Sequence, residues 1–295
     1  MKKYLFLSLL LLISINIAAS GQLHIMTYNI WNGFDWGKDT KREIAFNKFI
    51  RSSNPDVLAL QELCGYTQEK LEKQAKKWGH PYAVIIKENG YPVGITSKRP
   101  INVKEKLLEG MWHGMLHCET FGIDFFVVHL SPHDYSFRIK EARIITEKIK
   151  NIKNKNYIVL GDFNSHSPYD ADIDKQKKQL LKAYQRNDKK NQKHNNLLVN
   201  EFDYSVISKF LSFPLIDVCQ KYITPEEKFS FPTLVFKKEE ASIQDYSRKY
   251  ERIDYILASP NLSRNCIRAK IINNKEAAYL SDHYPLVADF TELVH

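Results

Sequence analysis

The chain has 295 residues, of which 43% are hydrophobic and 26% are charged, and its formal net charge is +9. These values exclude a disordered or fibrous chain and allow one large α/β domain or two small ones. The positive charge is compatible with an anionic partner such as DNA or a phospholipid surface. It is equally compatible with ordinary solubility, so charge alone does not identify a partner.

The first segment, 1–20, has the pattern of a signal peptide. Two lysines precede an apolar stretch, and the small residues AAS follow at 18–20, with no cysteine nearby for lipid attachment. A charged start, a short apolar run and small residues at a cleavage point are typical of an export signal. We therefore expect cleavage near Ser20 and an exported protein, periplasmic or secreted, with one domain over 21–295. An uncleaved membrane anchor is the alternative.

Strand and helix patterns alternate through most of the remaining chain. Helices are expected at 67–78 and 136–150, and from Thr40, where Thr40 and Glu43 have the spacing of a capping box. The stretch 206–218 has the pattern of a helix that continues into a strand. Further strands are expected at 23–30, 56–62, 82–87, 93–97, 101–108, 113–119, 123–130, 157–164, 229–234, 252–259 and 286–290. Mixed strands and helices without a Pro/Gly linker predict a single layered α/β domain.

One lysine-rich segment, 175–193, interrupts this alternation because it has few apolar residues and almost no acids. Such a charge run is typical of a solvated insertion or a surface helix. Electrostatic steering of a substrate is the alternative role.

Four cysteines, at positions 64, 118, 219 and 266, are too far apart in sequence for a C-x-x-C metal or redox motif. An oxidising compartment would permit up to two disulfides among Cys64, Cys118, Cys219 and Cys266, and the sequence leaves the pairing open.

The most informative pattern is the type of residue found where the apolar strands end. Strand ends of a layered sheet converge in space, and sites are built there. The residues concerned are acids, amides and imidazoles, namely Asn29, Glu62, His129, Asp162, Asn164, Asp254, Asp282 and His283. Carboxylates suit Mg²⁺ or Mn²⁺, histidines exchange protons near neutral pH, and amides can hold phosphoryl oxygens. Because no serine or cysteine lies in a nucleophile elbow, metal-assisted attack of water on phosphorus fits best.

These residues lie in six segments, TYNI, NPDVLALQE, VVHLS, VLGDFN, RIDYIL and SDHYPL, which follow one another over 27–286. Together they resemble the endonuclease/exonuclease/phosphatase superfamily, whose members include DNase I, neutral sphingomyelinases and inositol polyphosphate 5-phosphatases. The resemblance implies a DNase I-like four-layer α/β sandwich, with two face-to-face mixed sheets and helices outside. It also implies Mg²⁺-dependent hydrolysis of phosphoesters.

The same resemblance implies a metal site and substrate contacts. Glu62 would bind the metal, with Asn29 helping to place the metal or the phosphate. Asp282 would be a second ligand or a support for the first. Trp31 and His133, which follow the TYNI and VVHLS segments, are candidate substrate contacts, and ordinary packing is the alternative for Trp31.

Catalytic roles carry over in the same way. His283 would activate the attacking water and would be oriented by Asp254. Asp162 and Asn164 would position the nucleophile and hold the phosphoryl oxygens. His129 would donate a hydrogen bond to the phosphate or a proton to the leaving oxygen.

Two departures narrow the choice of relatives. Abasic-site endonucleases have an acid where this chain has Trp31, and a tyrosine where it has His129. With export, these departures argue against intracellular DNA repair. By analogy with DNase I, Glu88 is a candidate for the carboxylate that orients His129.

The leading hypothesis is an exported Mg²⁺-dependent phosphodiesterase, either a nuclease acting on DNA or a phospholipid head-group hydrolase. A small-molecule phosphomonoester phosphatase is the alternative within the same chemistry, and a catalytically inactive binding module is the alternative outside it. The sequence implies no stable protein partner, and a monomer is expected.

Overall fold

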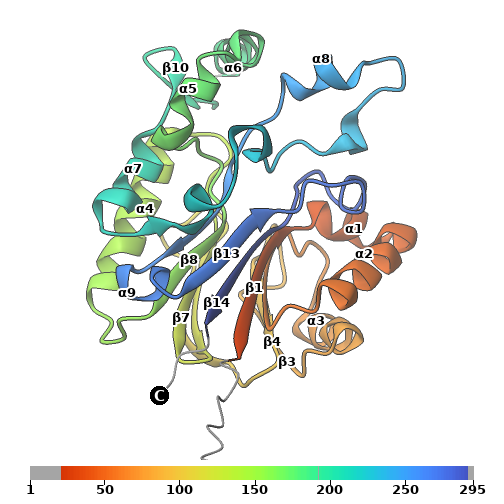
Figure 1. Cartoon of the computed structure of the whole chain (residues 1–295), viewed down its shortest axis with the longest axis vertical. Helices are drawn as coiled ribbons and strands as arrows, with labels where there is room; N and C mark the ends of the chain where they lie inside the picture. Colours follow the sequence, from red (N-terminus) through yellow and green to blue (C-terminus); the bar gives the residue numbers. More distant parts are fainter. Residues whose placement is uncertain (1–20, 192, 292–295) are drawn as a thin grey trace, which may run out of the picture.

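The computed structural model describes residues 21–191 and 193–291, so the expected signal peptide at 1–20 lies outside the described residues. Two six-stranded sheets face each other, and helices cover their outer faces (Figure 1). This arrangement confirms the expected four-layer α/β sandwich. Within the described residues, no helix is long and apolar enough to span a membrane.

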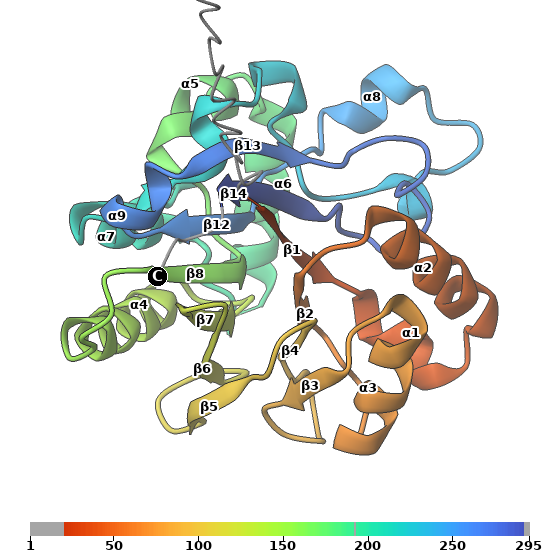
Figure 2. The same ribbon diagram turned by 60° about the horizontal axis from the view of Figure 1, so that its bottom comes forward.

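The first sheet contains the strand that opens the fold and the strand that closes it. Its order is β13 (Cys266–Ile271), β14 (Leu286–Thr291), β1 (Gln22–Asn29), β2 (Val57–Gln61), β4 (Gly94–Ser97) and β3 (Tyr82–Ile85). The pair β1–β2 is parallel and the other pairs are antiparallel. Helices α2 (Thr40–Ser53) and α3 (Gln68–Ala75) lie on the outer side of this sheet (Figure 2).

The second sheet has the same mixed construction. Its order is β11 (Ile216–Asp217), β12 (Asp254–Ala258), β8 (Tyr157–Asp162), β7 (Ile123–His129), β6 (Met115–Thr120) and β5 (Asn102–Leu107). Strands β7 and β8 are parallel, and the remaining pairs are antiparallel. Helices α4 (Tyr135–Lys150) and α7 (Ser205–Ser212) cover its outer face.

The central strands of the second sheet are buried on both faces. In β7, Phe125 and Val127 belong to the core between the sheets, whereas Phe126 and Val128 belong to the core under α4 and α7. Because side chains alternate along a strand, His129 continues the row that faces the other sheet. Burial on both faces also explains why these strands are nearly continuous apolar runs in the sequence.

The lysine-rich segment forms a surface helix, as expected. Helix α6 (Lys178–Lys190) packs Leu180 against Leu197 and Phe202, which lie on the short hairpin that follows it. The smaller elements around it are η2 (Pro168–Asp170), α5 (Ala171–Asp174), β9 (Leu197–Leu198) and β10 (Glu201–Phe202). Elsewhere the chain forms α1 (Trp31–Gly37), η1 (Lys76–Trp78), η3 (Val218–Lys221), η4 (Pro225–Glu227), η5 (Leu234–Phe236), α8 (Ile243–Ser247) and α9 (Pro260–Ser263).

Two local expectations were wrong, and one strand was missed. Helix α2 begins at Thr40, but its N-cap is Asp39, whose carboxylate accepts a hydrogen bond from the Arg42 N–H, so Thr40 and Glu43 form no capping box. The segment 229–234 forms no strand, only an isolated bridge between Phe231 and Glu251. Strand β13 was not expected, because the alternation of buried and exposed residues is interrupted at Ile267 and Arg268, which are both exposed beside an irregularity in the pairing with β14.

The four cysteines are all buried and free in the structure, at positions 64, 118, 219 and 266. No disulfide joins any of them, and they pack as small apolar side chains.

Close approach of β7 and β8 requires a glycine at position 161. Gly161 has a φ of +137°, and a Cβ there would overlap the carbonyl oxygen of Val128 on the neighbouring strand. We predict that Gly161→Ala lowers the free energy of unfolding by about 2 kcal/mol or more, since overpacking adds to backbone strain. Urea denaturation measures this loss.

The matched control is Gly79→Ala, because Gly79 also has a positive φ but nothing lies within 4 Å of an added Cβ. That variant should lose only about 1 kcal/mol. Equal losses in the two variants would contradict the steric argument.

Candidate active site

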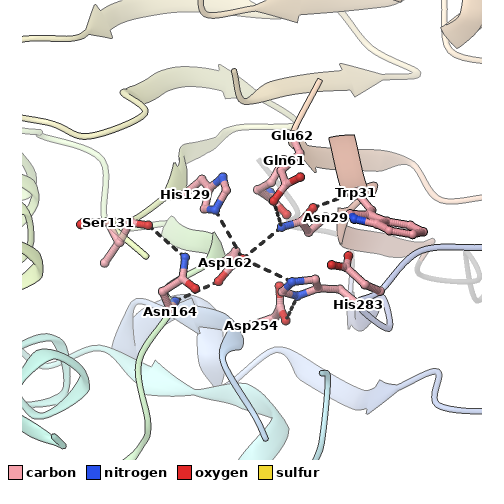
Figure 3. A network of polar contacts seen from close by, with 12 residues as sticks. Asn29, Trp31, Gln61, Glu62, His129, Ser131, Asp162, Asn164, Asp254 and His283 are labelled. Atoms are coloured by element: carbon pink, nitrogen blue, oxygen red, sulfur yellow. Dashed lines mark hydrogen bonds and ion pairs between the residues drawn. The ribbon is translucent and has the colours of Figure 1, made fainter. Parts of the chain in front are cut away.

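Polar side chains from both sheets meet at one end of the sandwich, where β1, β2, β7 and β8 end (Figure 3). A cavity of about 400 Å³ opens there. It is lined by Glu62, Tyr91, Trp112, His113, His129, Pro132, His133, Asp162, Asn164 and His283. Five of the eight strand-end residues singled out in the sequence therefore line one cavity.

Asp162 is the central residue of this group. In the strand register it is paired with His129 on β7 and with Asp254 on β12. Its Oδ2 atom lies 3.5 Å from His129 Nε2 and 3.7 Å from His283 Nε2. Burial and the nearby charge of Asp254 raise the pKa of Asp162 to about 7.

His283 forms a buried pair with Asp254. Its Nδ1 lies 2.8 Å from Asp254 Oδ2, which leaves Nε2 directed toward Asp162. Burial alone would lower the pKa of His283, but the carboxylates of Asp254, Asp162 and Asp282 outweigh it and hold this pKa well above its usual range. This is the geometry of a histidine oriented by a carboxylate.

Asn29 lies between two carboxylates. Its Nδ2 donates to Glu62 Oε1 at 3.2 Å and to Asp162 Oδ2 at 3.0 Å, and its Oδ1 accepts from the Trp31 N–H. The neutral amide therefore lies between the Glu62 and Asp162 carboxylates without adding a charge of its own. Because Glu62 follows a strand of the first sheet and Asp162 ends a strand of the second, these two hydrogen bonds link the sheets at the site.

Element α1, which follows β1, is left-handed, because residues Trp31 to Trp36 all have positive φ. Left-handed residues other than glycine are unfavourable and concentrate at functional sites. This element directs the Asn32 N–H onto Glu62 Oε2 at 2.7 Å. It also turns the Trp31 ring toward Arg42 and Phe236, so Trp31 is not among the residues that line the cavity.

The loop that carries Asp282 and His283 is attached to the end of β1. Ser281 Oγ donates to the Asn29 carbonyl at 2.6 Å. Burial, with a contribution from the nearby charge of Glu62, raises the pKa of Asp282 to about 6. Asp282 is thus close to Glu62 although it does not line the cavity.

The loop after β8 brings Asn164 to the cavity in a left-handed conformation, with a φ of 48°. Its N–H donates to Asp162 Oδ1 at 2.8 Å, and its Nδ2 donates to the Leu130 carbonyl at 3.0 Å. The asparagine therefore ties the ends of β7 and β8 together beside the catalytic candidates.

Glu88 does not orient His129. The Glu88 carboxylate accepts from the Gln68 N–H at the start of α3, and His129 Nδ1 has no hydrogen-bond partner among the described residues. Instead, the ring of His113 stacks on His129 with centroids 4.2 Å apart. Burial lowers the pKa of both rings, that of His113 to about 3, so both are neutral.

The sequence did not identify the loop that supplies Trp112 and His113. A strand was expected from 113, but β6 begins only at Met115, because Gly110 and Gly114 both have positive φ. The buried Glu141 accepts hydrogen bonds from the N–H groups of Trp112 and Ser131, each at 2.9 Å. The GMWHG sequence, with two glycines around bulky rings, was the available signal for a loop.

His133 lines the cavity. Its ring stacks on His194 with centroids 4.6 Å apart and meets the Trp112 ring edge-on at 5.7 Å. The rim of the cavity is therefore aromatic on this side.

Among the described residues, one group of three possible metal ligands is close enough to share an ion. It consists of Asp162, Asp254 and His283, whose ligand atoms all lie within 4.8 Å of one another.

Comparison with known proteins gives consistent matches. The sequence pattern of the Endonuclease/Exonuclease/phosphatase family matches residues 26–283. The uncharacterized protein F14F9.5 of Caenorhabditis elegans is 34% identical over 79 residues, which are 27% of this chain and only 24% of that protein.

Solved structures match over 91% of this chain at 20% identity. They include an AP endonuclease from Archaeoglobus fulgidus, with a TM-score of 0.67 and 99% of its chain covered. The 3'-5' exonuclease NExo from Neisseria meningitidis has a TM-score of 0.65, again with 99% covered. A structure of the 3' phosphatase NExo bound to a product DNA hairpin has a TM-score of 0.63 with the same coverage. At this identity the likeness establishes the fold.

The environment of His283 leads to a prediction about its protonation. Replacing Asp254 by Asn removes a charge that holds the pKa of His283 high, so this pKa should fall by one unit or more, roughly 1.4 kcal/mol. NMR titration of the histidine ring measures it. An unchanged pKa in Asp254→Asn would contradict the pairing.

The sign of the stability effect follows from the same shift. A pKa that is higher in the folded chain stabilises the fold fully below the unfolded value of about 6.5, and this stabilisation declines as the pH rises through the folded-state pKa. The Asp254→Asn variant should show a weaker dependence on pH, because Asp162 and Asp282 still raise the pKa of His283.

Proposed function

The chain belongs to the endonuclease/exonuclease/phosphatase family, and on that premise we propose that it hydrolyses phosphodiesters, with nucleic acid as the preferred substrate class. The observation that carries the proposal is the buried group formed by Asp254, His283 and Asp162 at the floor of the cavity. A histidine held by one carboxylate and facing a second has the arrangement needed to take a proton from water.

In the proposed reaction, a water beside His283 Nε2 attacks the phosphorus atom and transfers its proton to that nitrogen. Asp254 stabilises the resulting imidazolium through its hydrogen bond to Nδ1. Asp162 and Asn164 hold the water and the phosphoryl oxygens. The bond from phosphorus to the leaving oxygen breaks as the bond to water forms.

His129 suits a role on the leaving-group side. Its lowered pKa keeps the ring neutral, and the absence of a partner on Nδ1 places the hydrogen on Nε2, which faces Asp162. A neutral Nε2–H can donate a hydrogen bond to a phosphoryl or leaving oxygen.

We propose that Glu62 and Asp282 hold Mg²⁺, or Mn²⁺ in its place, with Asn29 positioning Glu62. The fit rests on the donor set, because Mg²⁺ is bound through one or two carboxylates together with substrate phosphates. The nearby charge of Glu62 contributes to the raised pKa of Asp282, a repulsion that a cation would relieve. The ion would supply positive charge to the developing phosphoryl oxyanion.

Nucleic acid is favoured over the other substrate classes by two observations. The DNA hairpin bound to the Neisseria 3' phosphatase shows that this fold accommodates DNA in that protein. Exposed rings at the cavity rim, Tyr91 and Trp112, are suited to stacking on bases. A phospholipid head-group hydrolase and a phosphomonoester phosphatase are the other outcomes of the test below.

We also propose that the protein is exported after cleavage near Ser20, on the pattern of charged, apolar and small residues in the first segment. Mass spectrometry of the protein recovered from the periplasm or medium should give a mature chain that begins near Gly21. Recovery of the full-length chain in the membrane fraction would support an uncleaved anchor instead.

The catalytic assignment predicts the behaviour of a single variant. His283→Ala should lower kcat for bis-p-nitrophenyl phosphate by about 10²–10⁴ with Mg²⁺ present, the range for loss of a general base. Excess EDTA should abolish turnover by the unmodified protein. Faster hydrolysis of p-nitrophenyl phosphate than of the diester would move the assignment to a phosphomonoesterase.

The control is His24→Ala, because His24 lies on β1 away from the cavity and pairs with Asp289. It should retain the unmodified rate. Equal rates in the His283→Ala and His24→Ala variants would overturn the role of His283, and a folded protein inactive on all phosphoesters would indicate a binding module.

A further inference from the structure

A groove separates helix α6 from the segment that carries η5 and α8, and both helices lie at the top of the molecule in Figure 1. The cavity in this groove has a volume of about 440 Å³, and a second cavity of about 470 Å³ adjoins it, with Gln179 and Arg248 lining both. The groove is lined by the cations Arg186, Arg248 and Lys249 and by the rings of Phe231, Phe236 and Tyr246. Its two acids, Asp245 and Glu251, are each paired, with Arg248 and His166 respectively.

The groove begins next to the catalytic candidates. The ring of Phe231 lies 4.9 Å from the ring of His283, and the ring of Phe236 lies 5.2 Å from that of Trp31. Tyr246 is fixed beneath them by its hydroxyl, which donates to the Thr233 carbonyl. Phe231 thus lines the groove and packs against His283, so the groove adjoins the candidate site.

One face of helix α6 is cationic, and on that face Arg186 lines the groove while Lys178 lines the adjoining cavity. Lys178, Lys182, Arg186 and Lys190 recur every four residues along this helix, all exposed and none in an ion pair within the described part of the chain. Asp188 is the only acid of α6, and its carboxylate is used by two backbone N–H groups beyond the helix. Like charges at this spacing repel and weaken a helix, so the stripe has a stability cost unless an external anion compensates it.

The opposite rim adds two further cations. Lys249 is exposed, lies over the Tyr246 ring at 5.4 Å and forms no ion pair among the described residues. Arg248 pairs with Asp245 at 3.4 Å, but both side chains are more than half exposed, so this pair is weak. The groove thus combines an aromatic floor with positive charge on both sides.

This combination specifies the ligand. Successive cations on α6 are about 6 Å apart, which suits a chain of repeated phosphates better than a single lipid head group. An aromatic floor offers stacking surfaces that only unpaired bases can reach. A cavity of about 440 Å³ is of the size that holds one small ligand unit.

We propose that the groove between α6 and α8 binds the unpaired nucleotides that flank the cleaved phosphodiester of a single-stranded nucleic acid. The bases stack on Phe231 and Phe236, and the phosphates pair with Arg186 and Lys249. The proposal rests on the proposed phosphodiesterase function, because it assigns the substrate strand of that same site.

Binding without turnover tests it. The purified protein in EDTA is titrated against fluorescein-labelled dT12 and against an abasic oligonucleotide of the same length, with anisotropy as the readout. Arg186→Glu/Lys249→Glu should raise Kd for dT12 by roughly tenfold or more and reduce its dependence on salt. Phe236→Ala should raise Kd for dT12 by roughly tenfold and leave Kd for the abasic strand unchanged.

A charge-matched control is available at the C-cap of α9 and on β13. Arg264→Glu/Lys270→Glu makes the same change in net charge at two exposed positions outside both cavities. This variant should keep a Kd for dT12 within about twofold of the unmodified protein, because distant exposed charges are largely screened. It should also hydrolyse bis-p-nitrophenyl phosphate at the unmodified rate.

The outcomes separate the two proposals. Suppose that the protein hydrolyses the diester and that Arg186→Glu/Lys249→Glu binds dT12 as tightly as Arg264→Glu/Lys270→Glu does. This result would overturn nucleotide binding in the groove and leave the proposed phosphodiesterase activity standing. If the groove substitutions weaken dT12 binding but the protein hydrolyses no phosphodiester, nucleotide binding in the groove would be supported and the proposed phosphodiesterase activity would be overturned. The protein could instead bind anionic phospholipid vesicles more tightly than dT12, with that binding weakened by the groove substitutions. This result would overturn the proposal that the groove binds single-stranded nucleic acid.

Discussion

The register that pairs Asp162 with His129 on one side and with Asp254 on the other is the constraint on which this site depends. Side chains on neighbouring strands at the same register point to the same face of a sheet. All three therefore face the first sheet, at the level where Asn29 ends β1. A shift of one residue in any pairing would turn one of them into the core under α4 and α7, so the buried apolar pattern that fixes the register also fixes the catalytic geometry.

Burial of several carboxylates at one end of the sandwich determines the electrostatics. Burial and the mutual repulsion of neighbouring charges raise the pKa of Asp162 and Asp282, and the same charges raise that of His283. Removing charges from water is costly unless each is paired and hydrogen-bonded. The structure meets that cost partly with neutral donors such as Asn29 and partly with the hydrogen bond between His283 Nδ1 and Asp254. The cation proposed at Glu62 would compensate the remaining negative charge.

The sequence predicted the layers, and it singled out residues of which the structure brings five to one cavity, because both follow from local patterns. Apolar runs gave the strands, and polar residues at their ends marked the site, since strand ends of a layered sheet meet in space. The contacts that these residues make were harder to predict from the sequence. The stacking of His113 on His129 and the anchoring of Trp112 by Glu141 depend on a glycine-flanked loop folding over the cavity, which no periodicity encodes. Glu88 was misplaced because spacing along the chain does not report direction in space.

The central claim is that His283 and Asp254 form a proton-accepting pair beside, and not within, a metal site. A crystal structure with Mn²⁺, located by its anomalous scattering, tests it most directly. We expect an ion bound by Glu62 and Asp282, with the hydrogen bond between His283 Nδ1 and Asp254 intact. An ion bound among Asp162, Asp254 and His283 would overturn the proposed role of His283, because a ligated His283 could not accept a proton from water.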